Sequence, residues 1–134
     1  MEICTGGSVT NLVNFHSQHH LPSLAEEEIA YILNEVVQTV VYLNNHNTWH
    51  RDIKGSNIVS CPVSCIRTHL MCLLLQLLTE ECDVKLIDYG VACRLNSAED
   101  RRHTSVGTPY WMAPEVIMCE GQQLQDYDQR CDVW

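Results

Sequence analysis

Apolar residues between Glu26 and Leu43 recur at steps of three and four, which is the spacing of one face of an α-helix. The positions that follow this pattern are Ile29, Ile32, Leu33, Val36, Val37, Val40 and Val41. Ahead of them, Ser23 and Glu26 fit a capping box, in which the serine oxygen accepts one free amide and the glutamate reaches back to another. We therefore predict a long helix over residues 24–43 that buries this face against a core.

Shorter patterns flank this helix. Met1 to Cys4 is apolar and compatible with a strand, and the turn residues that follow at 5–8 end it. Val9 to Phe15 then has the length of a short helix, and Val84 to Ile87 that of a short strand. Residues 92–106 are polar and basic, as a mobile segment would be. The chain therefore predicts a mixture of helices and strands.

Residues 50–57 read His-Arg-Asp-Ile-Lys-Gly-Ser-Asn, which has the H-R-D-x-K-x-x-N spacing of a protein-kinase catalytic loop. A phosphoryl-transfer site needs a carboxylate to accept the hydroxyl proton, an ammonium near the moving phosphate, and an amide oxygen on magnesium. Asp52, Lys54 and Asn57 would supply these groups in that order. The motifs Asp-Tyr-Gly at 88–90 and Ala-Pro-Glu at 113–115 follow in the expected order, and together the three are far more specific than H-R-D alone.

These residues resemble a Ser/Thr protein kinase of the Ste20 group, and residues 101–115 are particularly close to it. Residues 2–10 and 127–134 look most like the kinase domain joined to class III myosins. The resemblance implies an α+β, protein-kinase-like fold. This chain would hold part of the large C-terminal lobe, from the hinge at residues 1–8, through the activation segment at 88–115, to the start of the helix after it.

The resemblance also implies a role for each matching residue of the catalytic loop and of the activation segment. Asp52 would be the catalytic base that orients the substrate hydroxyl, and Lys54 would contact the transferred phosphate. Thr108 would link this base to this lysine through its hydroxyl. Asn57 and Asp88 would hold Mg²⁺ ions that bridge the nucleotide phosphates.

ATP with Mg²⁺ is the implied cosubstrate, and serine or threonine hydroxyls of proteins are the implied acceptors. The hinge, with Glu2 and Cys4 among its cofactor-binding positions, would meet the adenine through its backbone. Tyr89 stands where this family usually has phenylalanine, and its hydroxyl would need a polar partner if it were buried.

Thr104 matches the position that is phosphorylated in this group, and Ser105 is a neighbouring candidate. A phosphate there adds nearly two negative charges, which Arg51 could receive through charge-assisted hydrogen bonds that order the loop. An upstream kinase or autophosphorylation would supply it. The alternative is an unmodified surface threonine.

Residues 59–76 have no counterpart in the family and read as an aberrant insert. Without these 18 residues, Ile58 would join Leu77, and the step from Asn57 to Asp88 would fall from 31 residues to 13. The insert opens with Val-Ser and closes with Gln, which a splice donor and a splice acceptor can encode. We therefore hypothesise a retained in-frame intron or a gene-model error.

If the insert is present in the protein, two strands compete for the place after Asn57. Residues 58–60 can form the strand and leave a long loop, or residues 77–79 can form it and draw away from Asn57. Only the first alternative keeps Asn57 anchored beside Asp52.

Composition narrows the function classes. The formal net charge of −9, with 8 basic against 17 acidic residues, argues against a nucleic-acid or anionic-membrane surface. The apolar run at 70–78 is far shorter than the roughly 20 residues that span a bilayer, so we expect no membrane span.

The eight cysteines are scattered and no signal peptide opens the chain, so we expect reduced thiols and a cytoplasmic protein. Cys61, Cys65 and His69 lack a fourth zinc ligand.

The length of 134 residues suits a piece of a kinase domain, because the bilobal fold needs roughly twice as many. The chain contains no glycine-rich phosphate loop and no lysine placed to pair with the nucleotide from a small lobe. We therefore expect the isolated chain to be inactive and its parent to be the enzyme.

A myosin motor in the parent would add an actin or cytoskeletal link. A noncatalytic pseudokinase or scaffold segment is the alternative, and a truncated product without a stable fold is a third.

Overall fold

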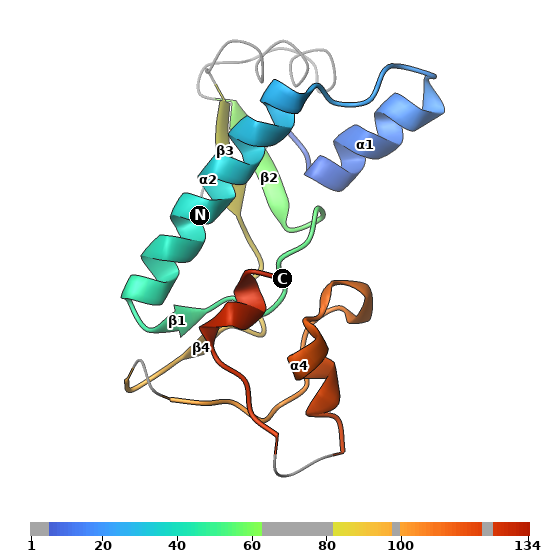
Figure 1. Cartoon of the computed structure of the whole chain (residues 1–134). Helices are drawn as coiled ribbons and strands as arrows, with labels where there is room; N and C mark the ends of the chain where they lie inside the picture. Colours follow the sequence, from blue (N-terminus) through green and yellow to red (C-terminus); the bar gives the residue numbers. More distant parts are fainter. Residues whose placement is uncertain (1–5, 63–81, 98–99, 122–124) are drawn as a thin grey trace. The chain divides into compact units, whose positions relative to one another are not determined.

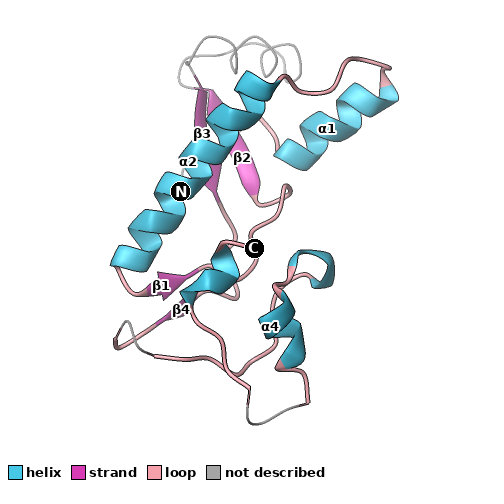
Figure 2. Ribbon diagram, viewed as in Figure 1, coloured by secondary structure: helices cyan, strands magenta, loops and turns pink. Residues whose placement is uncertain are grey.

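The computed structural model describes residues 6–62, 82–97, 100–121 and 125–134, and the chain divides into two compact units (Figure 1). Unit 1 comprises Met1–Thr39 and Gly55–Ile87, and unit 2 comprises Val40–Lys54 and Asp88–Trp134. Each unit contains both helical and strand segments (Figure 2), so the expected α+β class is confirmed. The hinge residues Met1 to Cys4 lie outside the described residues.

Unit 1 begins with helix α1, Val9–Gln18, which is three residues longer than the predicted helix. Ser8 caps it, because its hydroxyl accepts the Asn11 amide at 3.2 Å while Asn11 Oδ1 accepts the Ser8 amide at 3.3 Å. This reciprocal pair satisfies two amides at the helix start. Leu12 and His16 form the buried side of α1.

The long helix α2, Glu26–Asn45, confirms the predicted element but not its cap. The helix begins two residues later than expected, and Glu28 Oε2 accepts the Ala25 amide at 2.7 Å. The capping carboxylate is thus Glu28 and not Glu26. Three glutamates in the first turn place negative charge at the positive end of the helix dipole.

Only one row of the predicted apolar face of α2 is buried. Ile32, Val36 and Val40, each four residues apart, are buried. The neighbouring row is exposed and consists of Ile29, Leu33, Val37 and Val41. The expectation that the whole face is buried was therefore wrong for the residues that the structure describes, because their packing covers a narrower stripe than the sequence pattern marks.

Strands β2, Ile58–Pro62, and β3, Cys82–Leu86, form an antiparallel pair in which Ile58 faces Leu86 and Ser60 faces Val84. The strand after Asn57 is therefore formed by residues 58–62, which is the first of the two alternatives. Residues 63–76 of the expected insert lie outside the described residues.

The backbone of Gly6 and Gly7 runs along β2 in unit 1. The Gly6 amide donates to the Ser60 carbonyl at 3.1 Å, and the Ser60 amide donates to the Gly7 carbonyl at 3.0 Å. A Cβ on Gly6 would lie 2.6 Å from the Ser60 carbonyl oxygen, so this approach requires glycine.

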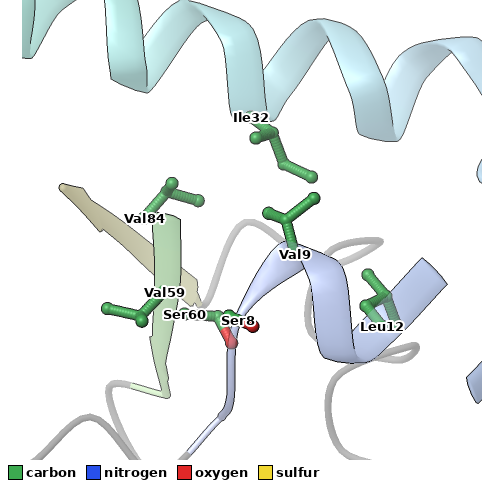
Figure 3. Close-up of a pocket in the computed structure, with 7 residues that line it drawn as sticks. All are labelled: Ser8, Val9, Leu12, Ile32, Val59, Ser60 and Val84. Carbon is green, nitrogen blue, oxygen red and sulfur yellow. The ribbon is translucent and has the colours of Figure 1, made fainter. Parts of the chain in front are cut away.

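A cavity of about 10 Å³ lies between α1, α2 and the β2–β3 pair (Figure 3). Its lining is mostly apolar and includes Leu12, Ile32 and Val84. Ser60 also lines it, is 7% exposed, and its hydroxyl has no hydrogen-bond partner in the part of the chain that the structure describes. A buried hydroxyl without a partner costs free energy, so Ser60 is a weak point of unit 1.

Unit 2 is built around a cluster of buried side chains to which Trp49, Leu95, Ala113, Val116, Cys119 and Tyr127 belong. Strand β1, Thr48–Trp49, pairs antiparallel with β4, Cys93–Arg94, and brings Trp49 opposite Cys93. The remaining elements are the short helix α4, Pro114–Met118, and two 3₁₀ turns, η1, Pro109–Trp111, and η2, Gln129–Asp132.

Asp132 in η2 holds the turn that follows β1. Its two carboxylate oxygens accept the backbone amides of His50 and Arg51, each at 2.7 Å. Arg51 adopts a left-handed backbone conformation with φ of 68°, which a side chain with a Cβ normally avoids. The two hydrogen bonds stabilise this conformation and place the next residue, Asp52.

The cysteines depart in part from the expected reduced state. Cys61 is disulfide-bonded, whereas Cys93, Cys119 and Cys131 are free.

Among the described residues, no three or more His, Cys, Asp or Glu side chains gather in a metal-binding group. Within the same described ranges, no helix has the length and apolar character needed to cross a membrane.

Ser60→Ala should raise the free energy of unfolding by about 1 kcal/mol, because it removes a buried hydroxyl that lacks a hydrogen bond. Urea denaturation of the two proteins measures the difference. Ser56→Ala, at an exposed position, is the control and should leave stability unchanged. A stability loss in Ser60→Ala would mean that the hydroxyl is paired in solution.

Asp132→Asn should lower the free energy of unfolding by about 1–3 kcal/mol, because an amide offers one acceptor oxygen to two backbone N–H groups. Thermal unfolding at neutral pH followed by circular dichroism is the measurement. Asp126→Asn makes the same change at an exposed carboxylate and should have no effect. Equal melting curves for wild type and Asp132→Asn would refute this account of the turn.

Candidate active site

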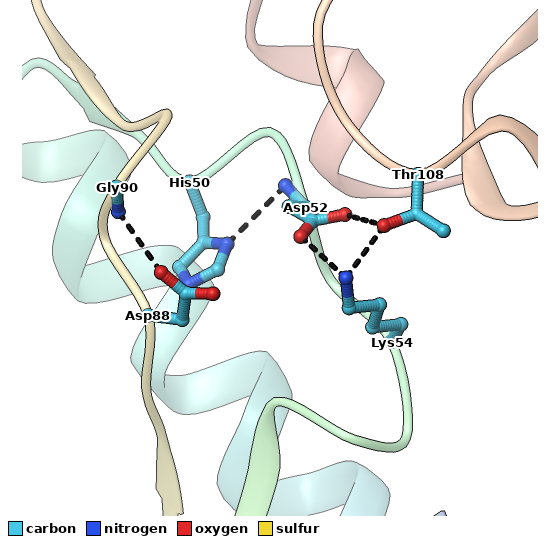
Figure 4. Close-up of polar contacts among 6 residues, drawn as sticks. All are labelled: His50, Asp52, Lys54, Asp88, Gly90 and Thr108. Atoms are coloured by element: carbon cyan, nitrogen blue, oxygen red, sulfur yellow. Dashed lines mark hydrogen bonds and ion pairs between the residues drawn. The ribbon is translucent and has the colours of Figure 1, made fainter.

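Three side chains of unit 2 form a closed set of hydrogen bonds (Figure 4). Lys54 Nζ donates to Asp52 Oδ2 at 2.8 Å and to Thr108 Oγ1 at 2.5 Å. Thr108 Oγ1 in turn donates to Asp52 Oδ1 at 2.6 Å. The side chains of Asp52 and Lys54 are 10% and 20% exposed, so an outside molecule has only limited access to the carboxylate.

Local backbone geometry brings Thr108 to this place, although it lies 56 residues after Asp52. Gly107 has φ of 125°, and a Cβ there would lie 2.6 Å from the Arg51 carbonyl oxygen. Only glycine allows the chain to pass so close. The following residue, Thr108, is the N-terminal cap of η1 and points its hydroxyl at Asp52 and Lys54.

His50 supports the loop from behind. It is fully buried, and its Nδ1 accepts the Asp52 amide at 3.3 Å. Its ring meets the Tyr89 ring edge to face, with ring centres 4.9 Å apart. Tyr89 is 46% exposed, and partial burial raises the pKa of its hydroxyl. The loop that carries Asp52 is therefore packed against the Asp-Tyr-Gly motif.

The Arg51 side chain donates hydrogen bonds to two groups, the Val91 carbonyl and the Tyr127 hydroxyl. Its Nε donates to the Val91 carbonyl at 2.7 Å, and its Nη2 donates to the same oxygen. Its Nη1 donates to the Tyr127 hydroxyl at 3.1 Å, and that hydroxyl donates to the Thr104 carbonyl at 2.7 Å. Thr104 itself is exposed and Ser105 is partly buried, so a modifying enzyme has better access to Thr104.

The two predicted magnesium ligands fall in different units. Asn57 belongs to unit 1, directly before β2, and its carbonyl accepts the amide of Ile87 at 2.8 Å. Asp88 is the first residue of the second segment of unit 2, and its Oδ1 accepts the Gly90 amide at 3.3 Å. Asp88 is exposed. Asn57 is buried, in contrast to Asp88. Amide and carboxylate oxygens are donors that Mg²⁺ takes, and the role of these two residues as its ligands stays a prediction.

Ionisation in unit 2 follows burial and hydrogen bonding. Burial raises the pKa of the Asp132 carboxyl, although the amides of Arg51 and His50 lower it in part. Burial likewise raises the pKa of Tyr127, against the effect of Arg51. The side chain of Arg130 lowers the pKa of Asp128.

The sequence predicted the contact of one group of three side chains, and it missed two further residues of the site. Asp52, Lys54 and Thr108 lie in contact as expected, while their roles stay predictions. Glu2 and Cys4 lie outside the described residues. Asp132 and Tyr127 were not predicted as part of the site. Their only signal was their place in the kinase-like run at 127–134, which carries no information about their partners.

The protein kinase domain family matches residues 1–134, the whole chain. Human Myosin-IIIa is 46% identical over 134 residues, human Nik-related protein kinase 42%, and Caenorhabditis elegans serine/threonine-protein kinase mig-15 41%. Each comparison covers 100% of this chain but only 7%, 7% and 10% of the relative, respectively. The geometry of the Asp52 loop and these similarities agree, and the chain belongs to the protein kinase family, within its Ste20 group.

Proposed function

We propose that this chain carries the catalytic and activation segments of an enzyme that transfers a phosphoryl group from Mg-ATP to serine or threonine hydroxyls of proteins. The observation that carries the proposal is the contact of Asp52, Lys54 and Thr108. It combines a proton acceptor, a cation and a positioning hydroxyl within hydrogen-bond reach of one another, which is what phosphoryl transfer to a hydroxyl requires.

In this proposal Asp52 accepts a hydrogen bond from the substrate hydroxyl and takes its proton as the phosphoryl group transfers. Lys54 donates to Asp52 Oδ2, which holds the ammonium against the proposed base. The same ammonium would contact the transferred phosphate and stabilise its charge. Thr108 holds both groups in place through its hydroxyl.

Asn57 and Asp88 would hold Mg²⁺, which neutralises charge on the nucleotide phosphates when it is bound. Glu2 and Cys4 of the hinge would contribute to the adenine site. Thr104, with Ser105 as a neighbour, would be the regulatory phosphorylation site, served by an upstream kinase or by autophosphorylation. The similarity to Myosin-IIIa supports a cytoplasmic location and a cytoskeletal link through a myosin motor in the parent.

A pseudokinase or scaffold segment is the second candidate. Parent sequence upstream of this chain that lacks the strand lysine would support it, because the lysines within this chain are Lys54 and Lys85 and neither is placed for that role. Lys85 is in β3 and pairs with Asp83 at 3.9 Å. The retained set of Asp52, Lys54, Asn57 and Asp88 favours the enzyme, because a binding protein has no chemical need for all four.

A chimera can test the proposed activity. Residues 1–134 would replace the aligned segment of mig-15, whose remaining domain supplies the rest of a kinase fold. We expect the chimera to label an acceptor protein with radioactive phosphate from Mg-ATP. Asp52→Asn should lower that rate by about 10²–10⁴-fold, since it removes the proton acceptor.

Two controls make this experiment decisive. Asp83→Asn changes an exposed carboxylate of β3 in the same way and should keep the activity. A second chimera without residues 59–76 shows whether the insert blocks the reaction. If both chimeras melt cooperatively and neither transfers phosphate, the pseudokinase alternative is correct.

The isolated 134-residue chain should bind ATP weakly and transfer no phosphate, because it contains no phosphate-binding glycine loop and no lysine to pair with the nucleotide. Titration calorimetry with Mg-ATP and a radiolabel assay measure the two properties. Turnover by the purified chain that disappears in Asp52→Asn would contradict this expectation.

A further inference from the structure

The Tyr127 side chain connects two parts of unit 2 that lie far apart in the sequence. Its hydroxyl accepts from Arg51 Nη1 at 3.1 Å and donates to the Thr104 carbonyl at 2.7 Å. The residue is 3% exposed, and its ring packs against Trp49 with ring centres 6.0 Å apart. Both hydrogen bonds are therefore partly buried on the Tyr127 side.

The backbone reinforces this connection. The Arg102 amide donates to the Tyr127 carbonyl at 3.1 Å, and the Tyr127 amide donates to the Arg102 carbonyl at 2.9 Å. Arg102 and Tyr127 thus form one isolated antiparallel bridge. His103 adds a contact between its Nδ1 and the Gln125 carbonyl at 2.9 Å.

Arg51 is engaged in this arrangement without a phosphate. Two of its nitrogens donate to the Val91 carbonyl and a third donates to Tyr127. Arg51 is the residue that was predicted to receive a phosphate on Thr104. It is already connected to Thr104 through the Tyr127 hydroxyl.

We propose that Tyr127 is a positioning residue that ties residues 102–104 of the activation segment to Arg51 while Thr104 is unphosphorylated. The proposal deepens the proposed function and rests on it for its regulatory meaning, but the tie itself is a physical property of the chain. Burial raises the pKa of Tyr127, so the hydroxyl keeps the proton that it donates at neutral pH.

The tie reaches the site by a short route. Arg51 precedes Asp52, its amide is held by Asp132, and its carbonyl lies against Gly107, next to Thr108. The order of residues 102–104 thus depends on Arg51. Arg51 is in turn adjacent to Asp52 in the chain and contacts Gly107, which precedes Thr108. Phosphorylation of Thr104 would strengthen an order that the chain already has.

Hydrogen exchange followed by mass spectrometry of the 134-residue chain tests the tie. Tyr127→Phe keeps the ring and removes only the hydroxyl, and it should speed amide exchange in residues 100–106 about tenfold. Exchange in β3 should stay unchanged. Tyr110→Phe, at a position that is 92% exposed, is the matched control and should leave both segments at wild-type rates.

Arg51→Lys separates positioning from simple packing, because lysine keeps the charge and loses the guanidinium fork. If Tyr127 acts through Arg51, the double variant should exchange little faster in residues 100–106 than either single variant. Wild-type exchange in Tyr127→Phe, or effects that multiply in the double variant, would overturn the proposal. Because this readout needs no catalysis, an inactive mig-15 chimera would refute the proposed function and leave this result standing.

Discussion

One partly buried carboxylate holds two consecutive backbone amides, and the site geometry of unit 2 depends on that pairing. Asp132 accepts the amides of His50 and Arg51 at equal distances of 2.7 Å. Without these bonds, Arg51 would lose the support for its left-handed conformation, and the direction of the chain into Asp52 would change. A charge that is costly to bury therefore fixes the position of another charge, the carboxylate that faces Lys54.

The activation segment completes the same construction from the other side. Gly107 passes the Arg51 carbonyl where no side chain would fit, and Thr108 then closes the set with Lys54 and Asp52. Each contact joins residues more than fifty positions apart, except that between Asp52 and Lys54. The loop by itself has the right residues, and the segment gives them a fixed arrangement.

Local patterns in the sequence predicted what depends on local interactions. The helices α1 and α2 and the strand near Val84 were predicted, because local periodicity and turn residues determine them. The predicted cap of α2 was wrong because the helix begins at Glu26, so that Glu28 and not Glu26 is the residue that reaches back to a free amide. The roles of Asp132 and Tyr127 were missed because their partners in the loop at 50–51 lie 76 to 82 residues away and Thr104 lies 23 away, and no local signal marks such pairs.

The exposed row on α2 has a consequence for work with the chain in isolation. Ile29, Leu33 and Val37 present branched aliphatic side chains to solvent at successive helical turns of unit 1. An exposed apolar stripe of this kind is recognised by chaperones and retained by hydrophobic resins. It also favours aggregation of the protein as its concentration rises. Yield of monodisperse material, more than any catalytic property, will decide how readily the purified polypeptide can be handled at the bench.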